Sequence, residues 1–248
     1  MDQTEPVEPP GSNGAGPHVG AGPHVGDGPH VFVDDLESPV LRDRDRHHLE
    51  RVLRLRDGDG LTICDGRGAW RRAVYGPEPR PAGELSVLAP AAPEVTVAFA
   101  PVKGDRPEWV VQKLTEIGVD RIIPITCDRS VVRWKGARSA NHMERLRRIA
   151  IEAGMQSRRV HLPIVEDPAS FAEVAARDGV ALADRGGDPA SLQHPTILVG
   201  PEGGWTPAER RSVDHSVGLG PHILRTETAA LAAGIMVCSA RYWGGLNA

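Results

Sequence analysis

The sequence predicts an α/β protein in which a small β-rich domain precedes a larger domain built on a mostly parallel sheet. Short apolar segments separated by Gly- and Asp-rich turns fill residues 30–88, a rhythm typical of a small β domain. From residue 95 onward, apolar segments alternate with stretches of helical periodicity. This alternation favours parallel strands covered by helices on both faces. Near the C-terminus, two strand–turn–helix units follow one another, at 197–209 and 219–234.

The N-terminal segment 1–28 is predicted to be a disordered tail. It is rich in Gly, Pro and Ala, and a GPHV repeat runs through 17–33. Such a composition cannot bury enough apolar surface to fold. Weak metal binding by the repeated histidines is the alternative. We expect the first domain at 29–90 and the second at 94–246, with a Pro-rich linker between them.

The β-rich domain is expected to contain one short helix. The segment between the first two strands places Leu49, Val52, Leu53 and Leu55 on one helical face. Turn signals DGDG and DGRG separate the strands. The predicted strands are 31–33, 61–64, 70–75 and 84–88.

The larger domain is expected to alternate strands and helices to its end. A helix over 106–118 has Gly118 as its stop signal. Another should begin at Thr206, which reads as an N-cap followed by Pro207 and by Glu209 as a capping-box partner. The predicted strands are 96–100, 121–126, 180–183, 196–200 and 222–224. The predicted helices are 106–118, 139–157, 168–178, 206–215 and 227–243.

Charge is distributed unevenly along the chain. The 248 residues carry a formal net charge of -4, yet between residues 121 and 161 ten Lys/Arg face three acids. A basic segment inside an acidic protein fits a phosphate-facing surface. A solvated, arginine-rich helix face is the alternative.

Cysteine usage and the N-terminus argue against a secreted or membrane protein. Cys64, Cys127 and Cys238 lie far apart, without zinc-ligand spacing, and their odd number argues against a disulfide framework. We therefore expect no metal. The N-terminus lacks the apolar segment of a signal peptide. The longest apolar run, at 229–238, is about half the length that a membrane span needs, so a cytoplasmic protein without membrane contact is expected.

The two C-terminal units carry the chemistry. In VGPEGGWTPAE, Gly200 ends a strand, and Gly203 and Gly204 permit positive φ or close backbone approach. A tight turn with nothing bound is the alternative for this segment alone. Together with ILRTETAALAA it strongly resembles the cofactor-binding region of the SPOUT RNA methyltransferases. In detail it is similar to the branch that methylates N3 of a uridine in small-subunit (16S) ribosomal RNA.

The resemblance covers roughly residues 30–243. It implies a knotted C-terminal SPOUT domain with a mostly parallel sheet, a PUA-like N-terminal β-barrel that grips RNA, and a homodimer. It further implies S-adenosylmethionine as the cofactor and small-subunit ribosomal RNA, assembled in the 30S subunit, as the substrate. The cofactor-binding residues it implies are Leu198, Gly200, Pro201, Glu202, Gly203, Leu219, Gly220, Leu224, Arg225 and Thr226.

Two residues of this region are candidates for catalysis. Uracil N3 carries a proton that must leave, so a base or an anion-stabilising cation is needed. Arg225 is the candidate to pair with negative charge on the ring oxygens or to hold a phosphate. Glu202 is the candidate for substrate positioning or proton acceptance; hydrogen bonding to its own loop is the alternative. Glu227 is the other nearby carboxylate, and negative charge is favoured in a first helical turn.

Basic residues outside this region are candidates for RNA contacts, each with an ordinary surface arginine or lysine as the alternative. Two positions depart from the family pattern: Arg158 stands where a Gly is common, and Trp205 where a Phe is common. The candidate RNA-binding residues are Arg51, Arg54, Lys103, Arg106, Arg129, Arg133, Arg158 and Arg159.

Two other functions stay open at this point. A SPOUT enzyme that methylates the ribose 2′-O would share the same cofactor region. A non-catalytic RNA-binding protein of ribosome assembly would not bind the cofactor at all.

Overall fold

The computed structural model describes residues 28–134 and 136–244. The predicted tail lies outside these ranges except for its last residue. The β-rich domain forms a four-stranded sheet in the order β1-β2-β3-β4, with β1 and β2 parallel and the other pairs antiparallel. Its elements are β1 (His30–Phe32), α1 (Asp43–His47), the π-helix η1 (His48–Val52), β2 (Gly60–Cys64), β3 (Ala69–Val74) and β4 (Arg80–Val87).

The helix of this domain differs from the predicted amphipathic one. Leu49 is buried in the domain core, but Val52 and Leu53 are 62% and 47% exposed. The reason is local: α1 continues into a π-turn, in which the Leu53 amide donates to the His48 carbonyl at 3.1 Å. The wider turn shifts the phase of the side chains, so a 3.6-residue period no longer describes them.

The larger domain contains a parallel sheet in the order β11-β9-β10-β5-β6-β7, and β8 pairs with β6. The prediction of a mostly parallel sheet is confirmed. Its strands are β5 (Thr96–Phe99), β6 (Arg121–Thr126), β7 (Ile164–Val165), β8 (Ala169–Ser170), β9 (Val180–Asp188), β10 (Thr196–Val199) and β11 (Ser216–Val217). Its helices are α2 (Arg106–Ile117), α3 (Gly136–Gln156), α4 (Phe171–Ala175), α5 (Pro207–Arg211) and α6 (Thr226–Gly244).

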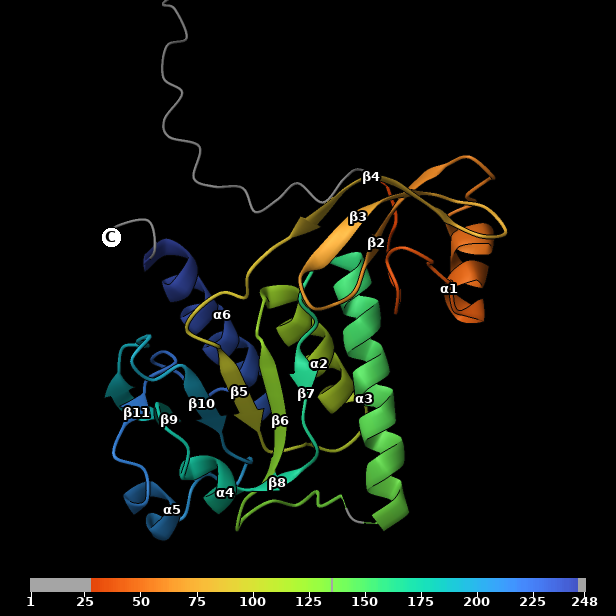
Figure 1. The fold of residues 1–248 in the computed structure, drawn as a ribbon. Helices are drawn as coiled ribbons and strands as arrows, with labels where there is room; N and C mark the ends of the chain where they lie inside the picture. Colours follow the sequence, from red (N-terminus) through yellow and green to blue (C-terminus); the bar gives the residue numbers. More distant parts are fainter. Residues whose placement is uncertain (1–27, 135, 245–248) are drawn as a thin grey trace, which may run out of the picture.

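Side chains of each central strand alternate between two apolar cores. Val97 and Phe99 of β5 pack with the buried faces of α2, α3 and α6. Ala98 of the same strand lies in the second core, which includes Phe171 of α4 and Trp205. This period of two is what a strand covered on both faces requires. In Figure 1 the three long helices lie together on one side of the sheet.

Several predicted boundaries are confirmed and others are wrong. The helix that begins at residue 106 ends before Gly118, which has φ 105°. The strand predicted at 222–224 does not form; that segment bends through solvent with Ile223 80% exposed. The sheet edge is occupied instead by β11, a two-residue strand too short to show a pattern. The helices predicted at 168–178 and 206–215 are shorter, each a five-residue element.

The β-rich domain packs against the larger domain through the segment that follows α3. The Gly68 amide donates to the Val160 carbonyl at 2.9 Å, and the Leu162 amide donates to the Gly66 carbonyl at 2.9 Å. Phe32, Cys64 and Trp70 form a shared apolar cluster with Val160. Figure 1 shows the β-rich domain above the C-terminal end of α3, and the carboxyl ends of the central strands pointing away from it.

Within the described ranges, no helix is long and apolar enough to cross a membrane. The same residues contain no group of three or more His, Cys, Asp or Glu side chains that could hold a metal ion.

Candidate functional site

Most predicted site residues of the larger domain gather at one edge of the parallel sheet. Strands β10, β5 and β6 run in the same direction and end at Val199, Phe99 and Thr126. The loops that follow them therefore emerge side by side. In open α/β sheets this carboxyl edge is where ligands bind.

The two glycine-containing turns, which together carry the family resemblance, contact each other directly. The Thr226 hydroxyl donates to the Gly200 carbonyl at 3.0 Å. Gly200 directly follows β10, whereas Thr226 begins α6, which packs against β10 and β5. Thr226 is 4% exposed, so this bond is shielded from water. The two turns are thus fixed to one another at their base.

Trp205 supports the first turn from below. Its ring is buried, and its indole N–H donates to the Ala183 carbonyl at 3.0 Å. A Cβ on Gly200 would lie 3.0 Å from that ring, so only glycine fits there without displacement. The indole is therefore a packing group, and the larger ring at this position does not stack on a ligand from the open side.

The capping box predicted at the start of α5 is confirmed. Thr206 and Glu209 exchange side-chain and backbone hydrogen bonds, and Pro207 lies in the first turn. Glu209 is 5% exposed and also accepts a hydrogen bond from the Asp128 amide at 2.9 Å. The loop after β10 is thereby tied to the loop after β6.

Arg129 also holds the first turn. Its guanidinium donates to the Gly203 carbonyl at 2.9 Å and to the Trp205 carbonyl at 3.3 Å. Arg133 donates to the Asp128 and Ser130 carbonyls in the same loop. Both were predicted to bind phosphate. Because their donors bond to backbone carbonyls, we assign Arg129 to loop support and leave Arg133 as a secondary candidate.

On the open side of the turns lie groups that can meet a ligand. Glu202, Gly203, Gly220 and Arg225 are exposed. Gly220 has φ 131°, and a Cβ there would meet no atom within 4 Å. The turn at this point therefore leaves room for a bound molecule.

Residues 90–237 match the RNA methyltransferase domain, and residues 41–80 match the RNA methyltransferase PUA domain. The first match covers more than half of the chain. The chain belongs to this RNA methyltransferase family. With the parallel sheet and the joined turns, this confirms the predicted SPOUT fold class and the PUA-like domain.

Two curated relatives of this methyltransferase share a name. It is similar to the ribosomal RNA small subunit methyltransferase E of Mycobacterium tuberculosis, 34% identical over 210 residues that cover 75% of this chain and 80% of the relative. It is also similar to the enzyme of that name from Bacillus subtilis, with 31% sequence identity over 215 residues that cover 75% of this chain and 84% of the relative.

Solved structures resemble it over most of its length. A ribosomal RNA small subunit methyltransferase E from Neisseria gonorrhoeae bound to S-adenosyl methionine superimposes with a TM-score of 0.72 at 28% identity, covering 86% of this chain and 96% of that one. A putative methyltransferase from Legionella pneumophila with bound cofactor SAM superimposes with a TM-score of 0.74 at 27% sequence identity. The match covers 85% of this chain and 97% of that one.

Some residues predicted to bind the methyltransferase's cofactor are turned into the protein. The Leu198 side chain is fully buried in the second core, and Pro201 is also buried. The hydroxyl of Thr226 is used by Gly200. These three positions therefore have only backbone atoms to offer, whereas Leu219 and Leu224 are half-buried and can present apolar surface.

An ion pair lies beside the second turn. Arg106, at the start of α2, lies 3.4 Å from Glu227 in the first turn of α6. The Glu227 side chain is 12% exposed, and its Oε2 is buried without a hydrogen-bond partner among the described residues. Lys103 is exposed on the loop that precedes α2. Sequence reasoning placed Glu227 near the site but did not pair it with Arg106.

Arg159 corrects the predicted RNA surface. Its guanidinium donates to the carbonyls of Thr115, Val119 and His161 at 2.8–2.9 Å and lies 3.6 Å from Asp120. The side chain is only 12% exposed. We therefore exclude Arg159 from the RNA-binding set, because its donors hold the end of α2 to the segment after α3.

The remaining predicted RNA residues lie in or near the β-rich domain, not at the sheet edge. Arg51 and Arg54 are exposed in and after η1, and Arg158 is exposed at the end of α3. Arg158 has φ 54°, a conformation that favours glycine. Arg158 thus keeps the backbone conformation expected of the glycine that is common at this position in the family.

The cysteines do not supply a nucleophile. Burial raises the pKa of the Cys127 thiol to about 12, and those of Cys64 and Cys238 to about 11. Since the thiolate is the reactive form, all three are inert at neutral pH. The chemistry of the site must come from its charged and backbone groups.

Proposed function

We propose that this protein transfers a methyl group from S-adenosylmethionine to N3 of a uridine in small-subunit ribosomal RNA. The observation that supports this most is the Thr226–Gly200 hydrogen bond, which joins the two turns into one cradle at the carboxyl edge of the sheet. The names of the relatives and the SAM-bound neighbours point the same way.

The cradle fits the chemical character of this cofactor. Exposed backbone at Gly203 and Gly220 can hydrogen-bond the adenosine, and the half-buried Leu219 and Leu224 can cover its apolar faces. S-adenosylmethionine supplies an electrophilic methyl group on a sulfonium, so neither a metal nor a covalent nucleophile is required. The protein's task is alignment of donor and acceptor.

We assign the chemistry on the uracil to two exposed residues. Arg225 follows the second turn, where its guanidinium can stabilise negative charge as the N3 proton leaves. Glu202, exposed in the first turn, positions the base or accepts the proton. Arg106 is held by Glu227 at the rim of the cradle, where together with Lys103 it can contact the RNA backbone.

We further propose that the enzyme acts as a homodimer on the assembled 30S subunit in the cytoplasm. Helix α6 exposes Ile235, Tyr242 and Trp243 by 50–58%, an apolar surface typical of an interface. The β-rich domain and the cradle lie at opposite ends of the molecule in Figure 1. An RNA held by the β-rich domain of one copy would therefore be presented more readily to the cradle of the other.

The proposal is tested by mass spectrometry of nucleosides. Small-subunit RNA from a strain lacking the gene is incubated with purified protein and S-adenosylmethionine, then digested. We expect 3-methyluridine to appear only with the protein. A product methylated at the ribose 2′-O would identify a ribose methyltransferase. No product, together with no cofactor binding by calorimetry, would identify a non-catalytic RNA-binding protein.

A further inference from the structure

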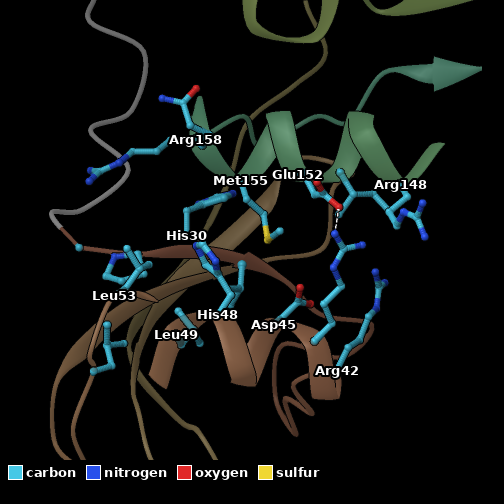
Figure 2. Close-up of a pocket in the computed structure, with 17 residues that line it drawn as sticks. His30, Arg42, Asp45, His48, Leu49, Leu53, Arg148, Glu152, Met155 and Arg158 are labelled. Carbon is cyan, nitrogen blue, oxygen red and sulfur yellow. Dashed lines mark ion pairs between the residues drawn. The ribbon is translucent and has the colours of Figure 1, made fainter. Parts of the chain in front are cut away.

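A ligand-sized space lies away from the cradle, between the two domains. It is a cavity of about 800 Å³ enclosed by β1, by α1 with η1, and by the last turns of α3. Figure 2 shows its side chains converging from the N-terminal helix on one side and from α3 on the other. This volume falls within the range of small-molecule sites, about 300–1,000 Å³.

The wall of the cavity combines apolar and cationic groups. Arginines from both elements line it, with Arg42 and Arg148 labelled on opposite sides in Figure 2. Arg148 and Leu53 are both exposed, Leu53 by 47%, and they lie at opposite ends of the lining in Figure 2. The apolar lining residues are Val31, Leu49, Leu53, Leu55, Ile151 and Met155.

The charge of the lining is net positive. Four arginines contribute to it, against the two acids Asp45 and Glu152. Glu152 is already paired with Arg44. With Asp45 counted as fully charged, the four arginines still outnumber the two acids. A cationic surface therefore remains for an anionic ligand.

The backbone around the cavity is strained. Arg54 and Arg158 are the two non-glycine residues with positive φ in the described ranges, at 58° and 54°. Arg158 lines the cavity, and Arg54 stands between the lining residues Leu53 and Leu55. The π-turn of η1 supplies two more lining residues. Strain and π-turns persist mainly where function maintains them.

His30 lines the cavity and has a buried ring nitrogen without a partner in the described part of the chain. It is 5% exposed, and its Nε2 lies 3.0 Å from the Arg159 carbonyl. A carbonyl only accepts, so Nε2 must carry the proton. Burial lowers the His30 pKa to about 4, which leaves Nδ1 as a neutral acceptor. That atom is buried without a hydrogen-bond partner among the described residues.

We propose that this cavity binds one unstacked ribonucleotide of the substrate RNA, with its apolar lining against the base and its arginines against the phosphate. Unpaired bases are recognised by contact of their faces with apolar or planar side chains, and phosphates by guanidinium groups. The bound nucleotide anchors the RNA at a distance from the methylated uridine. This inference rests on the proposed function, because it takes RNA as the substrate.

Binding of a short RNA tests the cavity directly. The probe is a fluorescein-labelled, single-stranded oligoribonucleotide of about ten residues, followed by fluorescence anisotropy at several salt concentrations. Arg148→Glu should raise its Kd about ten-fold or more, and should lower the slope of log Kd against log salt by about one. Leu53→Ser should weaken binding without changing that slope. Arg80→Glu, an equal charge reversal at an exposed site outside the cavity, should change Kd less than two-fold.

Equal effects of Arg148→Glu and Arg80→Glu would overturn the proposal, since they would indicate only general charge attraction. Competition with free uridine 5′-monophosphate distinguishes a site for a nucleotide within RNA from a site for a free nucleotide. We expect it to displace the labelled RNA only at millimolar concentration. Binding of the mononucleotide as tight as that of RNA would also overturn the proposal, because the site would then serve a free nucleotide.

Cross-linking locates the bound nucleotide independently of activity. With 4-thiouridine in the RNA, irradiation should attach peptides from residues 42–55 or 148–158. Cross-links confined to other segments would contradict the proposal. Failure of the wild-type protein to form 3-methyluridine would count against the proposed function alone. A protein that forms 3-methyluridine but gives no cross-links to residues 42–55 or 148–158 would count against the cavity alone.

Discussion

Replacement of Thr226 by Val tests whether the two turns act as one cradle. The change keeps the shape of a buried side chain but removes the hydroxyl that donates to Gly200 at 3.0 Å. The lost hydrogen bond contributes about 1 kcal/mol, and the unpaired carbonyl costs about 1–3 kcal/mol where it stays buried. We expect the free energy of unfolding in urea to fall by about 1–3 kcal/mol.

The same change should weaken cofactor binding. Once the turns are uncoupled, the cofactor must order them as it binds. A cost of about 1.4 kcal/mol corresponds to a ten-fold rise in Kd, measurable by isothermal titration calorimetry with S-adenosylmethionine. Thr115→Val is the matched control, because Thr115 is also buried and donates to the Val111 carbonyl at 2.8 Å, but within α2. It should reduce stability and leave Kd unchanged. A Thr226→Val protein with wild-type Kd would refute the reasoning.

Three further substitutions probe catalysis, pH dependence and the role of a buried arginine. Arg225→Ala should abolish methyl transfer while calorimetry still detects cofactor binding; retained activity would remove Arg225 from the mechanism. Burial lowers the pKa of His30 to about 4 in the folded protein, against 6.5 for an exposed histidine, so the unfolded chain binds more protons between these pH values. Its contribution to stability is complete above about pH 6.5 and is lost as pH falls towards 4, by about 2 kcal/mol between pH 7 and 5. His30→Asn should flatten this part of the pH profile in urea denaturation, and an unchanged profile would assign the effect to other groups. Arg159→Met should lower the free energy of unfolding by about 3 kcal/mol without changing the salt dependence of RNA binding. A reduced salt slope instead would restore Arg159 to the RNA surface.

Elements with local signals were predictable from the sequence. Helix α2 has a clear apolar stripe and ends before Gly118, and the strand 121–126 is bounded as predicted. The capping box at Thr206 was visible as a motif of four residues. In each of these the residues that decide the structure are neighbours in the chain, so periodicity and capping rules suffice.

Features that depend on distant partners were not predictable. The segment 222–224 has the composition of a strand, but no neighbouring strand is available to it and Ile223 remains exposed. The phase change at η1 arises from one π-turn that no residue type specifies. Strands of two residues, such as β7 and β11, are fixed by their pairing and carry no pattern of their own.

The candidate site divides in the same way. The meeting of the two turns followed from the family resemblance and is confirmed by the Thr226–Gly200 bond. The roles of Arg129 and Arg159 did not follow, because each donates to backbone carbonyls 40 or more positions away in sequence, those of Gly203 for Arg129 and of Thr115 and Val119 for Arg159. A guanidinium that supports a loop and one that binds phosphate look alike in a sequence. The interdomain cavity was also missed, since it is formed by segments that are separated by about a hundred residues.

Hydrogen–deuterium exchange with and without S-adenosylmethionine tests the central claim most directly. If the joined turns form the cofactor site, amides in 200–206 and 219–226 should gain protection together, while those around the interdomain cavity, at 48–55, should not change. Protection of only one turn, or of the interdomain segment in place of both, would contradict the assignment of the cradle.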